Sequence, residues 1–212
     1  MTLHLEENMK VGCYYLLKRL FDLIFAIVFT ILSIPLVLLV ALLIKIESPG
    51  PVIFKQKRIG SEKEPFVMYK FRTMVENAES LKTRYEHMSE GPFPAFKIRK
   101  DPRLTRVGKV LQKIHLDELP QLINVIMGDM SFIGFRPPLQ DEVDNYKKVY
   151  MKRFDGVPGI TSAWAINGMH KHTFDAWMKS DIWYNDNMSL LVDLKIIVGT
   201  VMLILKRLLK WK

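Results

Sequence analysis

Residues 23–44 read LIFAIVFTILSIPLVLLVALLI, a run of 22 residues without a charged side chain. A run of about 20 apolar residues is long enough to cross a hydrocarbon core of roughly 30 Å. Lys18 and Arg19 precede the run, and Lys45 follows it directly. The stretch therefore predicts a membrane helix, and the rest of the chain has to be placed relative to it.

Pro35 stands near the middle of this run, two residues after Ser33. Proline lacks the backbone N–H and clashes with the preceding turn, so it bends or breaks a helix. The parts 23–34 and 36–44 would be roughly 18 Å and 13 Å long, so neither crosses a bilayer alone. Basic residues normally mark the cytoplasmic side, and here they flank both ends. A kinked spanning helix and a re-entrant helix both stay open on this evidence.

The chain carries a formal net charge of +9, from 31 Lys and Arg against 22 Asp and Glu. Such an excess suits an anionic membrane surface, nucleic acid or phosphorylated substrates. The cations are dispersed and no aromatic-rich binding motif accompanies them, which disfavours nucleic acid. Cys13 is the only cysteine, so no internal disulfide can form and a reducing cytosolic face fits.

Two short strands are predicted at 52–55 and 66–74, around a polar turn. Alternation along the second strand places Lys70 and Arg72 on one face. Two cations on the same strand face suit a pyrophosphate group. The alternative for such a pair is a solvated basic face.

Asp117 and Glu118 stand at the start of a predicted helix that ends at Gly128. Asp117 can be a simple N-cap. A carboxylate at the positive end of a helix also stays ionised and can act as a nucleophile or metal ligand. Neighbouring residues lie about 100° apart on a regular helix, so the two carboxylates share one site only if they lie at its end.

Three further segments carry weaker signals. Arg136 precedes two prolines, and this fixed backbone suits bidentate phosphate binding. His170 and His172 are spaced as a metal pair would be, but nothing else nearby has ligand spacing. The basic, apolar C-terminal segment suits a helix lying in the membrane interface, with a buried core helix as the alternative.

Together, these segments resemble the monotopic polyprenyl-phosphate phosphoglycosyl transferases of the bacterial sugar transferase family. The resemblance covers most of the chain from Leu17 to Leu205. The matching segments, in the family's order, are KFRTM at 70–74, DPRLTRVG at 101–108, LDELPQL at 116–122, Asn124, GDMS at 128–131, Arg136-Pro137, and PGIT at 158–161 with Trp164 and NG at 167–168.

The resemblance implies a predominantly helical α+β fold with a re-entrant membrane helix broken at Pro35, a small β-hairpin and interfacial amphipathic helices. It divides the chain into an N-terminal extension at 1–16, the membrane helix at 17–46, a cytoplasmic catalytic domain at 47–189 and a C-terminal interfacial helix at 190–212. The enzyme would lie on the cytoplasmic face of the bacterial inner membrane.

It also implies transfer of a sugar 1-phosphate from a nucleoside diphosphate sugar to polyprenyl phosphate, which starts the assembly of a surface glycan. Asp117 would attack the sugar-bearing phosphate and give a covalent phosphosugar enzyme, while Glu118 would assist proton transfer. Mg²⁺ bound by Asp117 would neutralise the donor diphosphate. The expected substrate-binding residues are Lys70, Arg72, Arg103, Arg136 and Asp181, of which Asp181 matches an acidic family position.

Membrane lipids are further expected partners, and a homodimer is allowed for. Many members of the family have arginine where Val157 and Met169 stand here. The absence of these cations affects the expected contacts with the sugar donor more than the Asp117–Glu118 pair. His170 and Lys171 are the candidates to replace them. The competing hypothesis is a non-enzymatic membrane-surface protein that binds anionic lipids or partners through its basic face.

Overall fold

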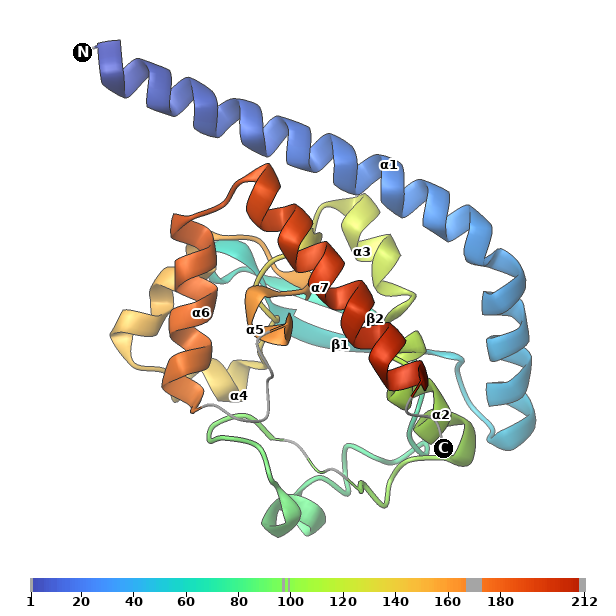
Figure 1. Cartoon of the computed structure of the whole chain (residues 1–212). Coiled ribbons are helices and arrows are strands. Elements are labelled where there is room, and N and C mark those ends of the chain that lie inside the picture. Colours follow the sequence, from blue (N-terminus) through green and yellow to red (C-terminus); the bar gives the residue numbers. More distant parts are fainter. Residues whose placement is uncertain (1, 97, 99, 167–172, 210–212) are drawn as a thin grey trace.

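The computed structural model describes residues 2–96, 98, 100–166 and 173–209, without the side chains of 2–11, 207 and 208. This part of the chain is predominantly helical and contains two small two-stranded sheets (Figure 1). The predicted α+β class with a small β-hairpin is therefore confirmed. The second sheet is an addition that the sequence patterns did not predict.

Helix α1 runs from Thr2 to Glu47 and contains Pro35. Figure 1 shows that it follows the outside of the molecule and changes direction toward its C-terminal end. Pro35 leaves the carbonyl of Ile31 without its helical donor, and the Ser33 hydroxyl donates to the neighbouring Thr30 carbonyl at 3.0 Å. The backbone is thus bent but stays helical through Pro35, so the predicted break is not an interruption of the helix. The re-entrant course remains a prediction.

The segment of α1 from Gly12 to Glu47 is long and apolar enough to cross a membrane. Most of its large apolar side chains are exposed, and only a few, among them Ala26, Val40 and Ile44, are buried against the rest of the protein. Such a continuous exposed apolar surface requires an apolar environment or partner. This exposure supports the prediction of a membrane helix in this part of the chain.

Three charged residues of α1 face the domain. The guanidinium of Arg19 donates to the carbonyls of Val125 at 2.5 Å and Ile126 at 2.9 Å. The carboxylate of Asp22 accepts from the Phe132 N–H at 3.2 Å. The Lys18 ammonium lies 3.4 Å from Asp193. The residues that flank the apolar run therefore join α1 to the domain.

The predicted hairpin consists of β1 (Ile53–Ile59) and β2 (Pro65–Phe71), which pair antiparallel across the short 3-10 helix η1 (Ser61–Lys63). The first strand runs further than predicted and the second ends earlier. In the register Phe54 lies opposite Lys70. The buried side chains of the second strand pack against α1, α2 and α3, so the hairpin lies next to the membrane helix.

The remaining elements form the rest of the domain. They are η2 (Thr83–Met88), α2 (Arg106–Lys113), η3 (Leu116–Glu118), α3 (Gln121–Met127), β3 (Ser131–Ile133), α4 (Gln140–Val143), η4 (Lys148–Asp155), β4 (Gly159–Thr161), α5 (Ala163–Ile166) and α6 (Phe174–Asp186). Strands β3 and β4 pair in parallel. The approach is close at Gly134, where an added Cβ would lie 1.9 Å from the Val157 carbonyl oxygen.

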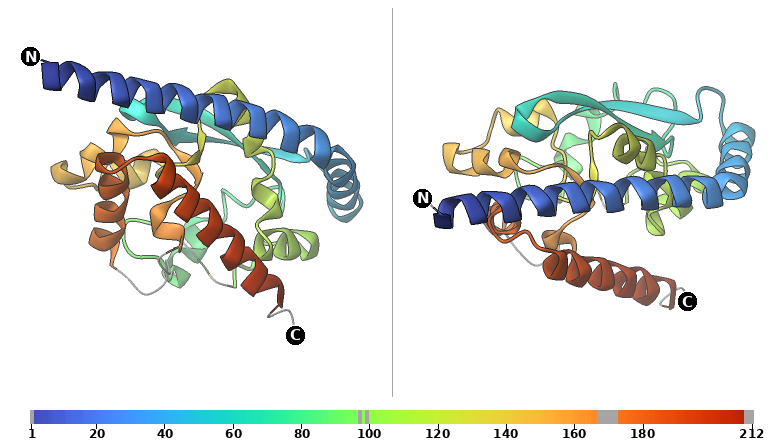
Figure 2. Two further views of the ribbon diagram at one scale, coloured as in Figure 1. Left: turned by 45° about the horizontal axis from the view of Figure 1, so that its top comes forward. Right: turned by 90° about the horizontal axis from the view of Figure 1, so that it is seen from above.

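Helix α7 (Leu190–Leu209) has two different faces. Ile196 is buried against Ile133, Ala163 and Tyr184. Leu191 on the other side is 72% exposed, and most of the large apolar residues of the helix are exposed with it. Figure 2 shows α7 and α1 running in roughly the same direction along the outside of the domain. The helix is therefore partly a core helix and partly a surface available to lipid.

Candidate active site

The two acidic residues lie on the 3-10 turn η3, one turn before α3. His115 starts this turn with a left-handed backbone, φ 58°, a conformation that non-glycine residues rarely adopt. The N-cap of α3 is Pro120, and no side chain caps that helix. Asp117 therefore does not cap the helix as its sequence position allowed. The dyad sits in a tight turn at a helix start, which satisfies the condition for the two carboxylates to share one site.

Strand β2 brings a lysine to this dyad. The Lys70 ammonium donates to the Glu118 carboxylate at 3.3 Å. The side chain of Asn124, fully buried on α3, accepts from the Tyr69 N–H at 3.0 Å and donates to the Val67 carbonyl at 2.7 Å. Asn124 thus binds the backbone of β2 on both sides of Met68. These two hydrogen bonds fix the strand that carries Lys70 against the helix that follows the dyad.

The surroundings shift the pKa values of the two carboxylates in opposite directions. Burial, and next the charge of Glu118, raise the pKa of Asp117 to about 6, while Lys70 acts in the opposite direction. Burial also acts to raise the pKa of Glu118, but the charges of Lys70, His115 and Arg136 outweigh it and lower that pKa below its ordinary value. Such a separation is typical of acidic pairs with two distinct chemical roles. At neutral pH both groups are mainly ionised, and Asp117 is the more basic.

Arg136 presents an exposed side chain from a segment whose backbone carbonyls are hydrogen-bonded to other elements. The Arg136 carbonyl accepts from Arg153 at 2.9 Å, and the Pro137 carbonyl accepts from Arg58 at 3.0 Å. The Pro138 carbonyl accepts from the Ile59 N–H at 3.0 Å. The structure assigns neither a turn nor a bend to residues 136–138, so the predicted stiff turn is not confirmed; the segment is fixed by these three hydrogen bonds instead. Its side-chain cation is near enough to the dyad to influence Glu118.

Arg58 belongs to the same charged neighbourhood. Burial, and next the positive charge of Arg136, lower its pKa to about 10, although Glu118 and Glu142 oppose this. Its guanidinium donates to the Gln56 side chain at 2.7 Å and 3.1 Å. Its contact with the Pro137 carbonyl joins residues 79 positions apart, which no local sequence pattern reveals.

The structure brings together four of the predicted site residues: Asp117, Glu118, Lys70 and, by its charge on Glu118, Arg136. The other three have their charged groups engaged elsewhere, and their predicted role in substrate binding stays a prediction.

Arg72 donates to Ser48 and Pro49, just after α1. Arg103 forms a buried pair with Asp101 and donates to Ala78. Asp181 pairs with Arg153 at 2.6 Å. Asn167, Gly168, His170, Lys171 and His172 lie outside the described residues, so neither the histidine pair nor the replacement cations are placed.

The acidic residues of the site suit a Mg²⁺ ion that takes few of its ligands from the protein. This ion keeps several waters and usually takes one or two carboxylates together with substrate phosphates. Asp117 provides one such carboxylate, while the Glu118 carboxylate is already bound by Lys70. Within the described part of the chain, no group of three or more His, Cys, Asp or Glu residues gathers into a closed metal cage. The residues present therefore fit an ion that arrives with a phosphorylated substrate.

Comparison with known proteins gives one consistent answer. The model of the bacterial sugar transferase family matches residues 13–207. The chain is 37% identical over 188 residues to the exopolysaccharide production protein ExoY of Sinorhizobium fredii, covering 87% of this chain and 83% of that protein. It is 40% identical over 193 residues to the UDP-glucose:undecaprenyl-phosphate glucose-1-phosphate transferase of Caulobacter vibrioides, covering 87% and 68%.

A third relative, the UDP-N-acetylgalactosamine-undecaprenyl-phosphate N-acetylgalactosaminephosphotransferase of Aeromonas hydrophila, is 40% identical over 214 residues. The match covers 95% of this chain but 48% of that protein. An acidic dyad facing cations, next to an exposed apolar helix, defines a membrane-associated group-transfer enzyme. The chain belongs to the bacterial sugar transferase family, which confirms its resemblance to the polyprenyl-phosphate phosphoglycosyl transferases.

Proposed function

We propose that the protein transfers a sugar 1-phosphate from a nucleoside diphosphate sugar to polyprenyl phosphate, and so starts the assembly of a surface glycan. The single observation that carries this proposal is the dyad itself. A buried carboxylate with a raised pKa stands beside a second carboxylate that Lys70, His115 and Arg136 keep ionised. The names of the relatives support the substrate class, since two of them transfer sugar phosphates in the context of undecaprenyl phosphate.

In the proposed first step, a carboxylate oxygen of Asp117 attacks the sugar-bearing phosphorus of the donor. The bond from this phosphorus to the bridging oxygen breaks, and nucleoside monophosphate leaves with both bonding electrons. The product is an acyl phosphate, in which the sugar 1-phosphate is joined to the Asp117 carboxylate as a mixed anhydride. Lys70 and Arg136 offset the negative charge that gathers when an anionic nucleophile meets a diphosphate.

In the second step, a phosphate oxygen of polyprenyl phosphate attacks the same phosphorus and releases the Asp117 carboxylate. The product is polyprenyl diphosphate sugar. Glu118 accepts the proton of the lipid phosphate where that phosphate enters protonated. Mg²⁺, held by Asp117 with the donor phosphates, would supply charge neutralisation of the diphosphate.

The apolar faces of α1 and α7 support a membrane-bound enzyme whose lipid substrate reaches the dyad from the membrane. We place this enzyme on the cytoplasmic face, with α1 entering and leaving the same leaflet through its bend. The attachment of α1 to the domain by Lys18 and Arg19 before the apolar run, and by Glu47 after it, is consistent with this course.

Release of nucleoside monophosphate tests the reaction. A panel of nucleoside diphosphate sugars is incubated with the purified protein in polyprenyl-phosphate-containing micelles, with and without Mg²⁺. We expect one donor to release monophosphate, and Asp117→Asn to lower that rate on the order of 10³-fold or more. Asp141→Asn is the matched control, because Asp141 is exposed and its ion pair within the described residues is with Lys82 at the surface.

Turnover by Asp117→Asn at the wild-type rate would contradict the covalent mechanism. No release from any donor, together with salt-sensitive vesicle binding that does not depend on Asp117, would favour the non-enzymatic membrane-surface protein.

Labelling of the single cysteine tests the topology. Cys13 is exposed and precedes the apolar run. In intact cells an impermeant maleimide should label neither Cys13 nor a cysteine introduced as Ser61→Cys with Cys13→Ser, while permeabilised cells should show both. Labelling of Cys13 alone in intact cells would identify a spanning helix instead.

A further inference from the structure

The segment 136–138, which carries Arg136, is held through its carbonyls. Pro137 and Pro138 have no N–H, so this segment has few backbone donors of its own. Three consecutive carbonyls accept hydrogen bonds instead, from Arg153, Arg58 and the backbone of Ile59. The position of the Arg136 backbone therefore depends on groups that come from other elements.

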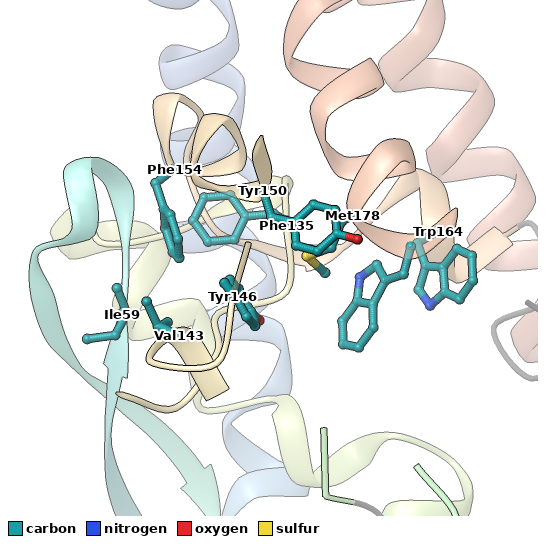
Figure 3. Close-up of a cluster of buried hydrophobic side chains, with 9 residues drawn as sticks. Ile59, Phe135, Val143, Tyr146, Tyr150, Phe154, Trp164 and Met178 are labelled. Carbon is teal, nitrogen blue, oxygen red and sulfur yellow. The ribbon is translucent and has the colours of Figure 1, made fainter. Parts of the chain in front are cut away.

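Arg153 is the most constrained of these groups. Its side chain, on η4, is 0% exposed. Its guanidinium lies 4.9 Å from the centre of the Phe135 ring and 5.6 Å from that of Tyr146, within the aromatic cluster that Figure 3 shows around these two residues. It also donates to the Tyr146 hydroxyl at 2.9 Å and to Asp181 at 2.6 Å. Both terminal nitrogens of the guanidinium donate hydrogen bonds and aromatic rings surround the group, while its Nε, also buried, has no partner among the described residues.

A buried ion pair is weak evidence for stability. Taking both charges out of water is expensive, and well-packed apolar residues of similar volume often stabilise a fold as well or better. The Arg153–Asp181 pair is thus poorly explained by the core alone. Its distinguishing feature is the 2.9 Å hydrogen bond to the Arg136 carbonyl, which links the core to a site residue whose own side chain is exposed.

We propose that Arg153, with Asp181 as its counter-ion, is a positioning residue that sets the backbone of Arg136 so that the Arg136 guanidinium meets the donor diphosphate. This inference rests on the proposed function. Arg153 touches no substrate and acts through Arg136. Asp181, predicted from the sequence to bind substrate, acts in this arrangement by holding Arg153.

A double-mutant cycle between positions 136 and 153 tests the inference. Arg153→Lys keeps the charge beside Asp181 but cannot reach Tyr146, Asp181 and the Arg136 carbonyl at once. We expect this variant to lower kcat/KM for the donor by about 10- to 100-fold, since a displacement of about 1 Å at a site can have such an effect. In an Arg136→Ala background the same change should lower it less than about twofold, because nothing remains to be positioned.

The Michaelis constant separates positioning from loss of folded protein. A smaller folded fraction lowers the apparent kcat and leaves KM unchanged. A displaced Arg136 raises the donor KM. Arg19→Lys is the matched control, because Arg19 also donates to two backbone carbonyls but on the far end of α3. Its effect should be the same in both backgrounds.

Two results would overturn the inference. One is an equal fall for Arg153→Lys with and without Arg136, which would make it a core residue only. The other is an Arg136→Ala variant with unchanged kcat/KM, because then no donor contact exists to be positioned. Neither result touches the dyad, whose role is decided separately by Asp117→Asn. Failure of the inference and failure of the proposed function are therefore distinguishable.

Discussion

Asp117 and Asp181 are both buried carboxylates, and the pKa of each is raised to about 6, yet their surroundings differ in kind. Burial is the largest cause in both. At Asp181 a guanidinium in direct contact opposes it. At Asp117 the charge of Glu118 adds to it. Among the residues that the structure describes, no cation lies within ion-pair distance of Asp117, because Lys70 binds Glu118.

The comparison teaches that a shifted pKa alone does not locate an active site. The Asp181 region is closed by aromatic rings and its charges are matched. The Asp117 region is partly open, with an exposed Arg136 and an acidic neighbour. Under the proposed function, the compensation for the Asp117 charge would arrive with the phosphorylated substrate and its cation.

Breaking the matched pair should have the largest effect on the fold. Arg153→Met leaves Asp181 buried without its cation, so we expect the free energy of unfolding to fall by about 3–5 kcal/mol at pH 7.5. Removal of Arg153 raises the pKa of Asp181 further above about 6, so the variant takes up this proton at a higher pH than wild type does. The deficit should therefore shrink as the pH falls from neutral to about 6, below which Asp181 is protonated in both proteins. Chemical denaturation in detergent micelles at pH 7.5 and pH 5 measures both. A deficit that is the same at the two pH values would contradict the assigned cause.

Neutralising the unmatched carboxylate should have the opposite sign. The pKa of Asp117 in the fold, about 6, exceeds its ordinary value of 3.8, so the ionised group destabilises the protein above pH 6. Asp117→Asn should therefore raise the free energy of unfolding at pH 7.5, by up to roughly 3 kcal/mol. The gain should be lost as the pH falls from about 6 to 4, where wild-type Asp117 is protonated as well. A variant that is less stable than wild type at pH 7.5 would refute this account.

Removing the shared lysine should move the pH dependence of the reaction. Lys70 lowers the pKa of both Asp117 and Glu118. With Lys70→Gln both pKa values rise, so the acidic limb of kcat/KM for the donor should shift upward by roughly one pH unit. Lys57→Gln is the control, because Lys57 is exposed on the same hairpin. An unshifted limb would show that neither carboxylate controls it.

The smallest effect is expected at Arg72. Its guanidinium donates to the Ser48 and Pro49 carbonyls at 2.8 Å and 2.5 Å. Arg72→Lys should lower the free energy of unfolding by about 1 kcal/mol, because lysine lacks the two terminal nitrogens that make these hydrogen bonds. The donor KM should stay at its wild-type value, measured at a temperature where the variant is fully folded. An increased donor KM would instead support the substrate-binding role predicted from the sequence.

The sequence predicts the elements better than the pairing of their charges. The apolar run, the hairpin and the helix after the dyad follow from local periodicity, and the structure contains all three. The dyad and Lys70 meet as expected because both lie at the ends of such elements. The partners of Arg153 could not be predicted from the sequence, because Asp181 lies 28 residues further along the chain and on another helix.

Two arginines show why residue type is a poor guide to a substrate contact. Arg103 follows Asp101 by two residues and folds back on it in a buried pair. The sequence predicts Arg72 on the strand face of Lys70, but β2 ends at Phe71 and the Arg72 guanidinium donates to the loop after α1. Both are cations within segments typical of the family. Only side-chain packing distinguishes them from Lys70, and packing is a tertiary property.

The way α1 is held has a practical consequence for protein production. Its Glu47 carboxylate accepts from the N–H groups of Arg106 at 2.6 Å and Val107 at 2.8 Å at the start of α2. Arg19 donates to a backbone carbonyl of α3, and Asp22 accepts from a backbone N–H of β3. Ala26 and Val40 each belong to a buried cluster of the domain. Deleting this helix to obtain a soluble enzyme would remove parts of two cores and several backbone partners. The membrane anchor and the catalyst are one folding unit, so detergent or nanodisc preparations of the full chain are the appropriate material.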